Sequence, residues 1–195
     1  MKINVIIGTV RPGRVSERVA KWVAAKAAEQ PDMEVKLVDL ADFGLMHFNE
    51  PVSPRFNPDR KLSKGVAKWL ESVDAADGFV IVTPEYNHSV PGVLKDALDV
   101  LKFEMAKKPV AIVSHGTVGG ARAAEHLKGI LIEARAAVVP QAVALIGATS
   151  QIDEDGHFAG DPESPVSPDA ALGTVLKELS WWTATLKNGR AALAK

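Results

Sequence analysis

The chain of 195 residues is long enough for one domain with a substantial core and too short for two comfortable ones. Its 23 lysine and arginine residues nearly balance 24 aspartate and glutamate residues, and the formal charge of −1 offers no basic footprint for a nucleic-acid partner. The absence of cysteine excludes disulfide bonds, zinc–thiolate sites and thiol nucleophiles.

The first predicted element is a short buried strand over Ile3–Ile7, which is β-branched and nearly continuous in apolar character. Strand-like sequence starts within three residues of the first, and no apolar run reaches membrane-spanning length. We therefore expect a cytoplasmic protein without a signal peptide or a membrane partner. A helix follows from Ser16, the candidate N-cap, with Val19 and Val23 on its buried face.

The turn between this strand and this helix, Gly8–Ser16, is rich in glycine, hydroxyl groups and arginine. Such a turn points backbone N–H groups and the positive end of a helix dipole at the space above the strand. Arginine adds a planar fork of donors that suits phosphate oxygens. The sequence therefore predicts a phosphate-anchoring loop, although a simple polar turn with an N-cap favours the same residue types. The candidate side-chain donors are Thr9, Arg11, Arg14 and Ser16.

The next stretch alternates polar and apolar residues over Glu34–Leu40, which predicts a strand near the sheet edge. The segment Asp42–Asp59 has no clean periodicity and contains three prolines and three phenylalanines. We expect a functional loop or an interface here, because exposed phenylalanines would be a liability on a monomer. Helical spacing follows over residues 62–73, and residues 78–83 form the clearest buried strand of the chain.

The loop Pro84–Gly92 follows that strand directly and is bounded by prolines. Tyr86 and Asn87 could supply a flat wall and amide groups for a planar heteroaromatic ring. Glu85 and His88 suggest acid–base catalysis, but loop residues of these types are more often solvated or at an interface. Nothing resembles a nucleophile elbow, so no Ser-His-Asp arrangement is assigned.

A fourth apolar strand, Val110–Val113, leads into the loop Ser114–Gly120. The glycine pair at its end would allow close approach of the backbone to a ligand, and the alternative is a flexible turn before a helix. The histidines show no metal-ligand spacing, and we expect no metal site. The remaining predicted elements are a helix over 123–134, a strand over 136–139 with an extension to 146, a polar surface segment over 149–168 and a closing helix over about 168–187.

Strand–helix alternation five times over predicts one α/β domain spanning residues 1–195. Right-handed crossovers favour a three-layer, doubly wound, five-stranded parallel sheet in the flavodoxin-like order. In such sheets ligands bind beyond the carboxyl ends of the strands, at the switch point of the strand order. The loops after strands one, three and four all lie at those ends, so we expect them to form one site.

Two motifs carry a family resemblance. They are Gly8-Thr9-Val10-Arg11 with Ser16, and the run Thr83–Lys95 that contains Pro-Glu-Tyr-Asn. With these motifs the chain resembles the NADPH-dependent FMN reductase family, which has the flavodoxin-like fold and includes quinone, azo-dye and chromate reductases. The resemblance implies binding of the FMN phosphate and of the two sides of the isoalloxazine ring. The implied residues are Thr9, Arg11, Gly13, Arg14, Val15 and Ser16 for the phosphate, Pro84, Glu85, Tyr86 and Asn87 for one side of the ring, and Ser114, His115 and Gly116 with Gly119 and Gly120 for the other.

The resemblance implies an FMN-dependent NAD(P)H oxidoreductase. Hydride would pass from NADPH or NADH to flavin N5, and electrons would then pass to a small acceptor such as a flavin, a quinone, an azo compound or a metal oxyanion, by a ping-pong sequence. No protein residue is assigned as catalytic, because the flavin carries the chemistry. The resemblance also implies a homodimer or homotetramer, with Phe43–Phe56 and the Glu85-Tyr86 loop at the subunit contact.

Two alternatives belong to other functional classes. One is a flavodoxin-like electron carrier that uses a protein redox partner. Such carriers tend to be strongly acidic, and the formal charge of −1 argues against this alternative. The other is a non-enzymatic nucleotide or phosphate-ligand binding module, because a fold alone does not fix a function.

Overall fold

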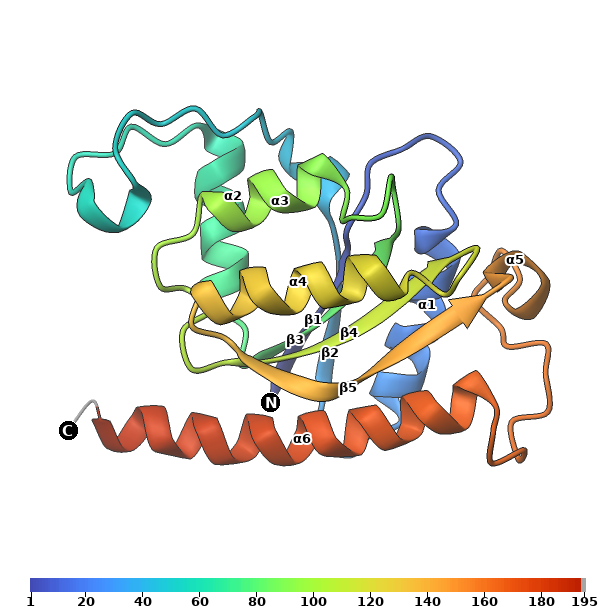
Figure 1. Ribbon diagram of the computed structural model, residues 1–195. Helices are drawn as coiled ribbons and strands as arrows, with labels where there is room; N and C mark the ends of the chain where they lie inside the picture. The colour runs from blue at the N-terminus through green and yellow to red at the C-terminus, as the bar shows by residue number, and fades with distance from the viewer. Residues whose placement is uncertain (194–195) are drawn as a thin grey trace.

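A computed structural model describes residues 1–193 and has three layers, with a parallel sheet between two layers of helices (Figure 1). The sheet has five strands in the order β2-β1-β3-β4-β5, and every strand pair is parallel. The predicted flavodoxin-like topology is therefore confirmed. The predicted domain extends to residue 195, and residues 194 and 195 lie outside the described part.

The observed elements follow the predicted ones closely. The strands are β1 Lys2–Ile7, β2 Glu34–Asp39, β3 Gly78–Pro84, β4 Pro109–Gly116 and β5 Ala137–Ile146. The helices are α1 Ser16–Ala28, η1 Leu40–Phe43, η2 Pro54–Phe56, α2 Lys64–Asp74, α3 Gly92–Asp99, α4 Ala121–Glu133, α5 Ala148–Gln151 and α6 Pro168–Leu193, where η marks a 3-10 helix.

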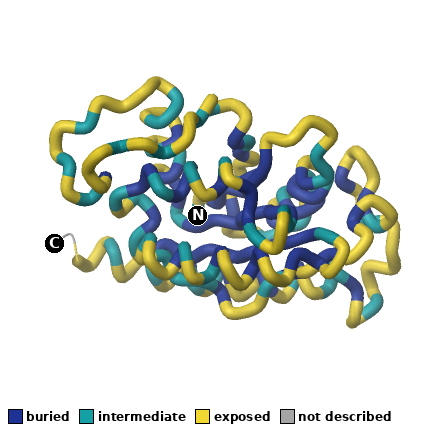
Figure 2. Tube along the Cα trace, turned by 45° about the horizontal axis from the view of Figure 1, so that its top comes forward, coloured by how far each residue is buried: buried dark blue, intermediate teal, exposed yellow. Residues whose placement is uncertain are grey.

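Both faces of the sheet are covered. Every residue of β3 is buried, and because side chains alternate across a strand, its even and odd positions enter different cores. Val80 and Val82 pack against α1 and α6, whereas Phe79 and Ile81 pack against α2, α3 and α4. Figure 2 shows buried chain at the centre of the molecule, inside a mostly exposed outer trace, and strands β1, β3 and β4 are buried over nearly their whole length.

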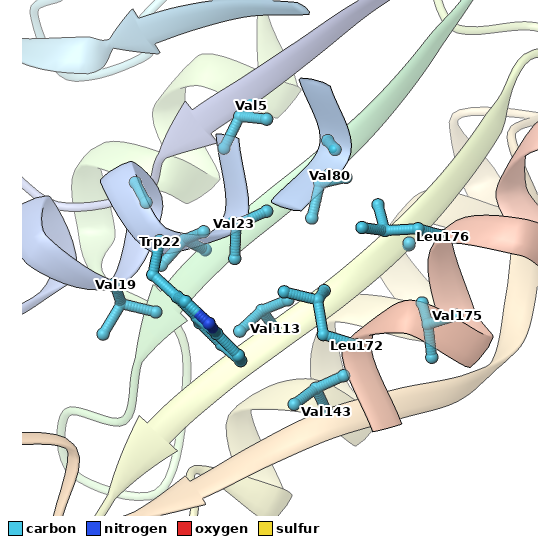
Figure 3. Close-up of a cluster of buried hydrophobic side chains, with 14 of the residues drawn as sticks. Val5, Val19, Trp22, Val23, Val80, Val113, Val143, Leu172, Val175 and Leu176 are labelled. Carbon is cyan, nitrogen blue, oxygen red and sulfur yellow. The ribbon is translucent and has the colours of Figure 1, made fainter. Parts of the chain in front are cut away.

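The core beneath α1 and α6 is joined by a polar contact as well as by packing. In Figure 3, Trp22 of α1 and Leu172 of α6 point into the same cluster, which also contains Val113 and Val143. Trp22 Nε1 donates a hydrogen bond of 3.0 Å to the buried carboxylate of Asp169, at the start of α6. The long closing helix is thereby fixed against the helix that follows the first loop.

Three predicted boundaries need correction. Strand β4 runs three residues further than predicted, so Ser114, His115 and Gly116 belong to the strand and not to the loop after it. The last strand is continuous over Ala137–Ile146, with a register shift opposite Val110 and Ile112 that adapts it to β4. The closing helix begins at Pro168 and extends six residues beyond the predicted end, to Leu193.

The irregular segment after β2 exposes fewer aromatic side chains than the sequence suggested. Phe43 and Phe48 pack against the core formed by α2, α3 and α4, and Phe43 makes an edge-on contact with Trp69. Phe56, in contrast, is 80% exposed, and Met46 is 78% exposed. The exposed large apolar side chains of this segment are therefore Met46, Val52 and Phe56, and only one of them is a phenylalanine.

Candidate cofactor site

Loops from three strands meet at the carboxyl edge of the sheet, where the strand order reverses beside β1 and β3. Thr9 Oγ1, in the loop after β1, lies 3.1 Å from the hydroxyl oxygen of Tyr86, in the loop after β3. Ser16 Oγ, at the start of α1, lies 2.7 Å from Nε2 of His115, near the end of β4. The predicted convergence of these segments on one edge is confirmed.

The first loop leaves β1 in close contact with β3. A Cβ atom on Gly8 would lie 2.8 Å from the Val82 carbonyl oxygen, and glycine is therefore required for the chain to pass here. Thr9 is buried, and its hydroxyl also receives the Arg11 backbone N–H at 3.4 Å. The exposed Arg11 guanidinium lies 5.8 Å from the centre of the Tyr86 ring and is available to an anion above the loop.

The N-terminus of α1 is open to an anion. Val15 occupies the N-cap position, and it has no side-chain acceptor for the N–H groups of the first turn. Those N–H groups have no partner within the helix, and the helix dipole adds to their attraction for a phosphate. The prediction of Ser16 as N-cap is wrong, because Ser16 is the first helical residue and its buried hydroxyl contacts His115.

Arg14 has a different environment from Arg11. Its guanidinium forms an ion pair with Asp39 at the end of β2, and its side chain is 16% exposed. Its Nε atom is buried and has no hydrogen-bond partner within residues 1–193. The Asp39 contact anchors the loop to the sheet, while the unpaired Nε leaves one buried donor for a ligand oxygen.

The second loop is a tight hairpin. Tyr86 and Ser89 exchange backbone hydrogen bonds of 2.9 and 3.0 Å across the two residues between them. Asn87 and His88 have φ angles of 48° and 67°, the pair of left-handed conformations that a type I′ turn requires. The turn fixes Tyr86 beside the first loop and leaves His88 exposed at the tip, without the enclosure that an acid–base catalyst needs.

Glu85 points toward α4. Its carboxylate accepts hydrogen bonds from Arg122 Nε at 2.6 Å and from the Arg122 backbone N–H at 3.1 Å. The Arg122 guanidinium lowers the pKa of the Glu85 carboxyl below its ordinary value, so the group stays ionised. Gly120, the N-cap residue of α4, has no side chain, and Glu85 supplies the missing acceptor. A role as general acid does not fit this environment.

The glycine pair before α4 is needed for packing against the sheet. Gly120 has a φ of 72°, and a Cβ atom on it would lie 2.8 Å from Ser114 Cβ and 2.9 Å from the His115 nitrogen. Ser114 Oγ donates a hydrogen bond of 2.7 Å to the Gly119 carbonyl oxygen, which closes the turn. The close approach that the structure shows for this pair is to β4, and the approach to a ligand stays a prediction.

A cavity within residues 1–193 lies away from this edge. It has a volume of about 750 Å³ and lies between the irregular segment, α3 and α4, with Phe48, Phe56 and Ile130 among its lining. Ser89 is its one lining residue from the second loop. We assign the strand-end site from donor geometry, because a phosphate needs N–H groups more than it needs an enclosed volume.

Sequence patterns did not reveal two of the site's contacts. Arg122 follows the glycine pair with no motif of its own, and Asp39 ends an edge strand where a polar residue is ordinary. The only signal for either was its position at the carboxyl edge of the predicted sheet. Within residues 1–193, no helix is long and apolar enough to cross a membrane, and no three His, Asp or Glu side chains could hold a metal ion.

These features define a class of protein. A parallel sheet in the order β2-β1-β3-β4-β5, with an open helix N-terminus at the switch point and an aromatic loop beside it, is a flavodoxin-like fold. The uncapped first turn of α1, the unpaired Nε of Arg14 and the exposed Arg11 fit a phosphate group.

Comparison with known proteins gives the family. The NADPH-dependent FMN reductase family matches residues 1–150, and the chain belongs to that family. It is therefore an NAD(P)H-dependent flavin oxidoreductase, with FMN as its flavin. An NAD(P)H-dependent FMN reductase of Schizosaccharomyces pombe is 38% identical over 144 residues, which cover 74% of this chain and 72% of the relative.

Two further similarities extend this comparison. An NADPH azoreductase of Bacillus sp. strain OY1-2 is 34% identical over 196 residues, covering 99% of this chain and 98% of the relative. The crystal structure of FerB, a flavoenzyme NAD(P)H:acceptor oxidoreductase from Paracoccus denitrificans, aligns with a TM-score of 0.74 at 22% identity, covering 93% of this chain and 96% of FerB. The structural match extends the shared fold to nearly the full length of both chains.

Proposed function

We propose that this flavin oxidoreductase holds FMN at the carboxyl ends of β1, β3 and β4 and passes electrons from NADPH or NADH to a small-molecule acceptor. The observation that carries the proposal is the uncapped N-terminus of α1 at the switch point, beside the Tyr86 hairpin. Bound FMN would supply the acceptance of hydride at N5, and the chain supplies binding and orientation.

The residues of the three segments have distinct proposed roles. Arg11, Thr9, Ser16 and the backbone of Gly13, Arg14 and Val15 hold the phosphate, because they surround the open helix terminus. The backbone of Pro84–Asn87 and the Tyr86 ring flank one side of the isoalloxazine ring, and the backbone at the end of β4, Ser114–Gly116, flanks the other. The Glu85 side chain contributes indirectly, by fixing the start of α4.

The reaction sequence follows from the single site. A nicotinamide and an acceptor cannot both lie over the same ring at once, so we expect ping-pong kinetics. Initial rates at several fixed acceptor concentrations should give parallel double-reciprocal lines against NADPH. Intersecting lines would show a ternary complex and contradict the single-site proposal. The acceptor is a flavin, a quinone, an azo compound or a metal oxyanion, and a screen of all four with both nicotinamides identifies it.

The irregular segment supports a proposed homodimer or homotetramer. Phe56, which lines the 750 Å³ cavity, and Met46 expose large apolar side chains, and a second subunit that covered them would remove that surface from water. Sedimentation velocity at micromolar concentration tests this proposal, and a monomer would contradict it. We also propose a cytoplasmic location, where NADPH and NADH are available, and fractionation of cells that produce the protein tests it.

Purification tests the activity directly. Protein that retains a yellow flavin excludes the phosphate-binding module, and bleaching of that flavin by NADPH without a protein partner excludes the electron carrier. A protein that binds FMN but is bleached only when a redox protein is added would support the carrier instead. Protein that binds no FMN under any condition would overturn the proposed site.

A further inference from the structure

One buried contact joins the phosphate loop to the middle of the sheet. Ser16 Oγ and His115 Nε2 are 2.7 Å apart, Ser16 is fully buried and His115 is 8% exposed. Ser16 is the first residue of α1, so its hydroxyl lies at the uncapped helix terminus. His115 comes from β4, next to the position where Gly120 packs against the strand backbone. The imidazole therefore reaches under the first turn of α1.

Whether Ser16 Oγ or His115 Nε2 donates the proton of this hydrogen bond determines whether the Ser16 hydroxyl can donate to a ligand. Burial lowers the pKa of His115 to about 4, so its ring is neutral at neutral pH and carries one N–H donor and one acceptor nitrogen. If Nε2 is the acceptor, the Ser16 hydroxyl proton points at the ring and is lost to any ligand. If Nε2 carries the proton, the ring donates to Oγ, and the hydroxyl proton is directed away from the ring.

A phosphate at the terminus of α1 selects the second arrangement. The anion needs donors, and a hydroxyl that donates to a charged oxygen makes a stronger hydrogen bond than one that donates to a neutral nitrogen. Once the hydroxyl proton is directed to the phosphate, Oγ becomes an acceptor, and the Nε2–H of His115 satisfies it. Both buried groups then have partners.

We propose that His115 is a positioning residue for the FMN phosphate: by donating Nε2–H to Ser16, it holds the Ser16 hydroxyl proton toward the anion at the start of α1. The inference rests on the proposed FMN site. It assigns the His115 side chain to the phosphate end, whereas the family resemblance implied a position beside the isoalloxazine ring. The two roles make opposite predictions for a flavin without a phosphate.

The test compares FMN with riboflavin, which has the same ring and no phosphate. Dissociation constants of apoprotein variants are measured by quenching of flavin fluorescence. Ser16→Ala and His115→Leu should each weaken FMN binding by about tenfold or more. The first variant removes the hydroxyl that donates to the phosphate, and the second removes the N–H that orients this hydroxyl. Both should leave the riboflavin affinity within about twofold of the wild type, a difference of less than one ordinary hydrogen bond.

Two further variants separate positioning from packing. His115→Gln retains an amide N–H donor at the same place and should recover most of the FMN affinity. The double variant Ser16→Ala/His115→Leu should bind FMN no more weakly than Ser16→Ala alone, because His115 acts only through the Ser16 hydroxyl. His157→Gln, which changes an exposed histidine paired with Asp153, is the matched control and should bind both flavins like the wild type.

The outcomes are distinct. Equal loss of FMN and riboflavin affinity in His115→Leu would place the side chain at the ring and overturn the inference. Additive losses in the double variant would do the same. In the FMN-bound protein, ¹⁵N chemical shifts should identify Nε2 of His115 as the protonated nitrogen, and the opposite tautomer would refute the proposal. If the wild type bound neither flavin, the proposed function itself would fail, whereas tight FMN binding with insensitive variants would remove only the positioning role.

Discussion

Gly120→Ala should lower the free energy of unfolding, because this N-cap residue of α4 packs directly against β4. The φ of 72° is a conformation that costs an L-residue about 1–2 kcal/mol. The added Cβ would also lie 2.8 Å from Ser114 Cβ and 2.9 Å from the His115 nitrogen, and overpacking of this kind costs about 1–3 kcal/mol. We therefore expect a loss of about 2–5 kcal/mol in the free energy of unfolding, and a Tm lower by roughly 10 °C.

The same helix offers a matched control. Gly129 lies within α4, and a Cβ atom on it would meet nothing within 4 Å. Gly129→Ala should therefore stabilise the apoprotein by about 0.5–1 kcal/mol, the ordinary preference of a helix interior for alanine. Both variants are measured by urea denaturation of the apoprotein with circular dichroism. If Gly120→Ala is as stable as the wild type, the turn is not packed tightly against β4.

Three further predictions concern ligand, pH and assembly. Arg11→Ala should weaken FMN binding by about tenfold with an unchanged circular dichroism spectrum. The control Arg18→Ala changes an α1 arginine paired with Glu154 and should leave FMN binding unchanged. Equal FMN affinity in both variants would show that Arg11 does not bind the phosphate. Because the folded pKa of His115 is about 4 against an ordinary 6.5, the neutral form stabilises the fold. That contribution is fully present above pH 6.5 and is lost as the pH falls toward 4, by at most about 3 kcal/mol. Between these pH values the free energy of unfolding of His115→Gln should fall less steeply with decreasing pH than that of the wild type. Parallel plots of the free energy of unfolding against pH would refute the burial of a neutral ring. Phe56→Asp should shift sedimentation toward the monomer without loss of secondary structure, and an unchanged oligomer would exclude this side chain from the interface.

The layers and the strand order could be predicted because local periodicity carries them. The apolar run over β3 is buried at every position, and strand–helix alternation leaves few right-handed topologies for five strands. The hydroxyl-rich loop after β1 and the Tyr86 loop after β3 could be placed on one edge for the same reason. The order of elements along the chain is enough to locate both loops.

Contacts between residues far apart in the chain could not be predicted. Ser16 has the composition of a helix cap, and only its contact with His115, which lies 99 residues away, reveals a buried partner instead. Gly119 and Gly120 have the composition of a flexible or ligand-binding turn, and only the distance from Gly120 to β4 shows that packing requires a glycine. In each case the same residue type suits two structural roles, and only the contact with a residue distant in the chain shows which role it has.

Glu85 shows how such a neighbour also directs the ligand. Helices α1 and α4 are among the helices that begin at this edge with N-cap residues that provide no side-chain acceptor. The Glu85 carboxylate fills the terminus of α4, and Arg122 keeps it ionised, so a second anion there would meet a like charge. At α1 the acidic residue of the first turn, Glu17, is instead paired with Lys21 at 3.6 Å, and Arg11 adds a positive charge to the preceding loop. The placement of one acidic side chain thus favours the phosphate at α1, and Glu85→Gln should reduce that discrimination while leaving the α1 contacts in place.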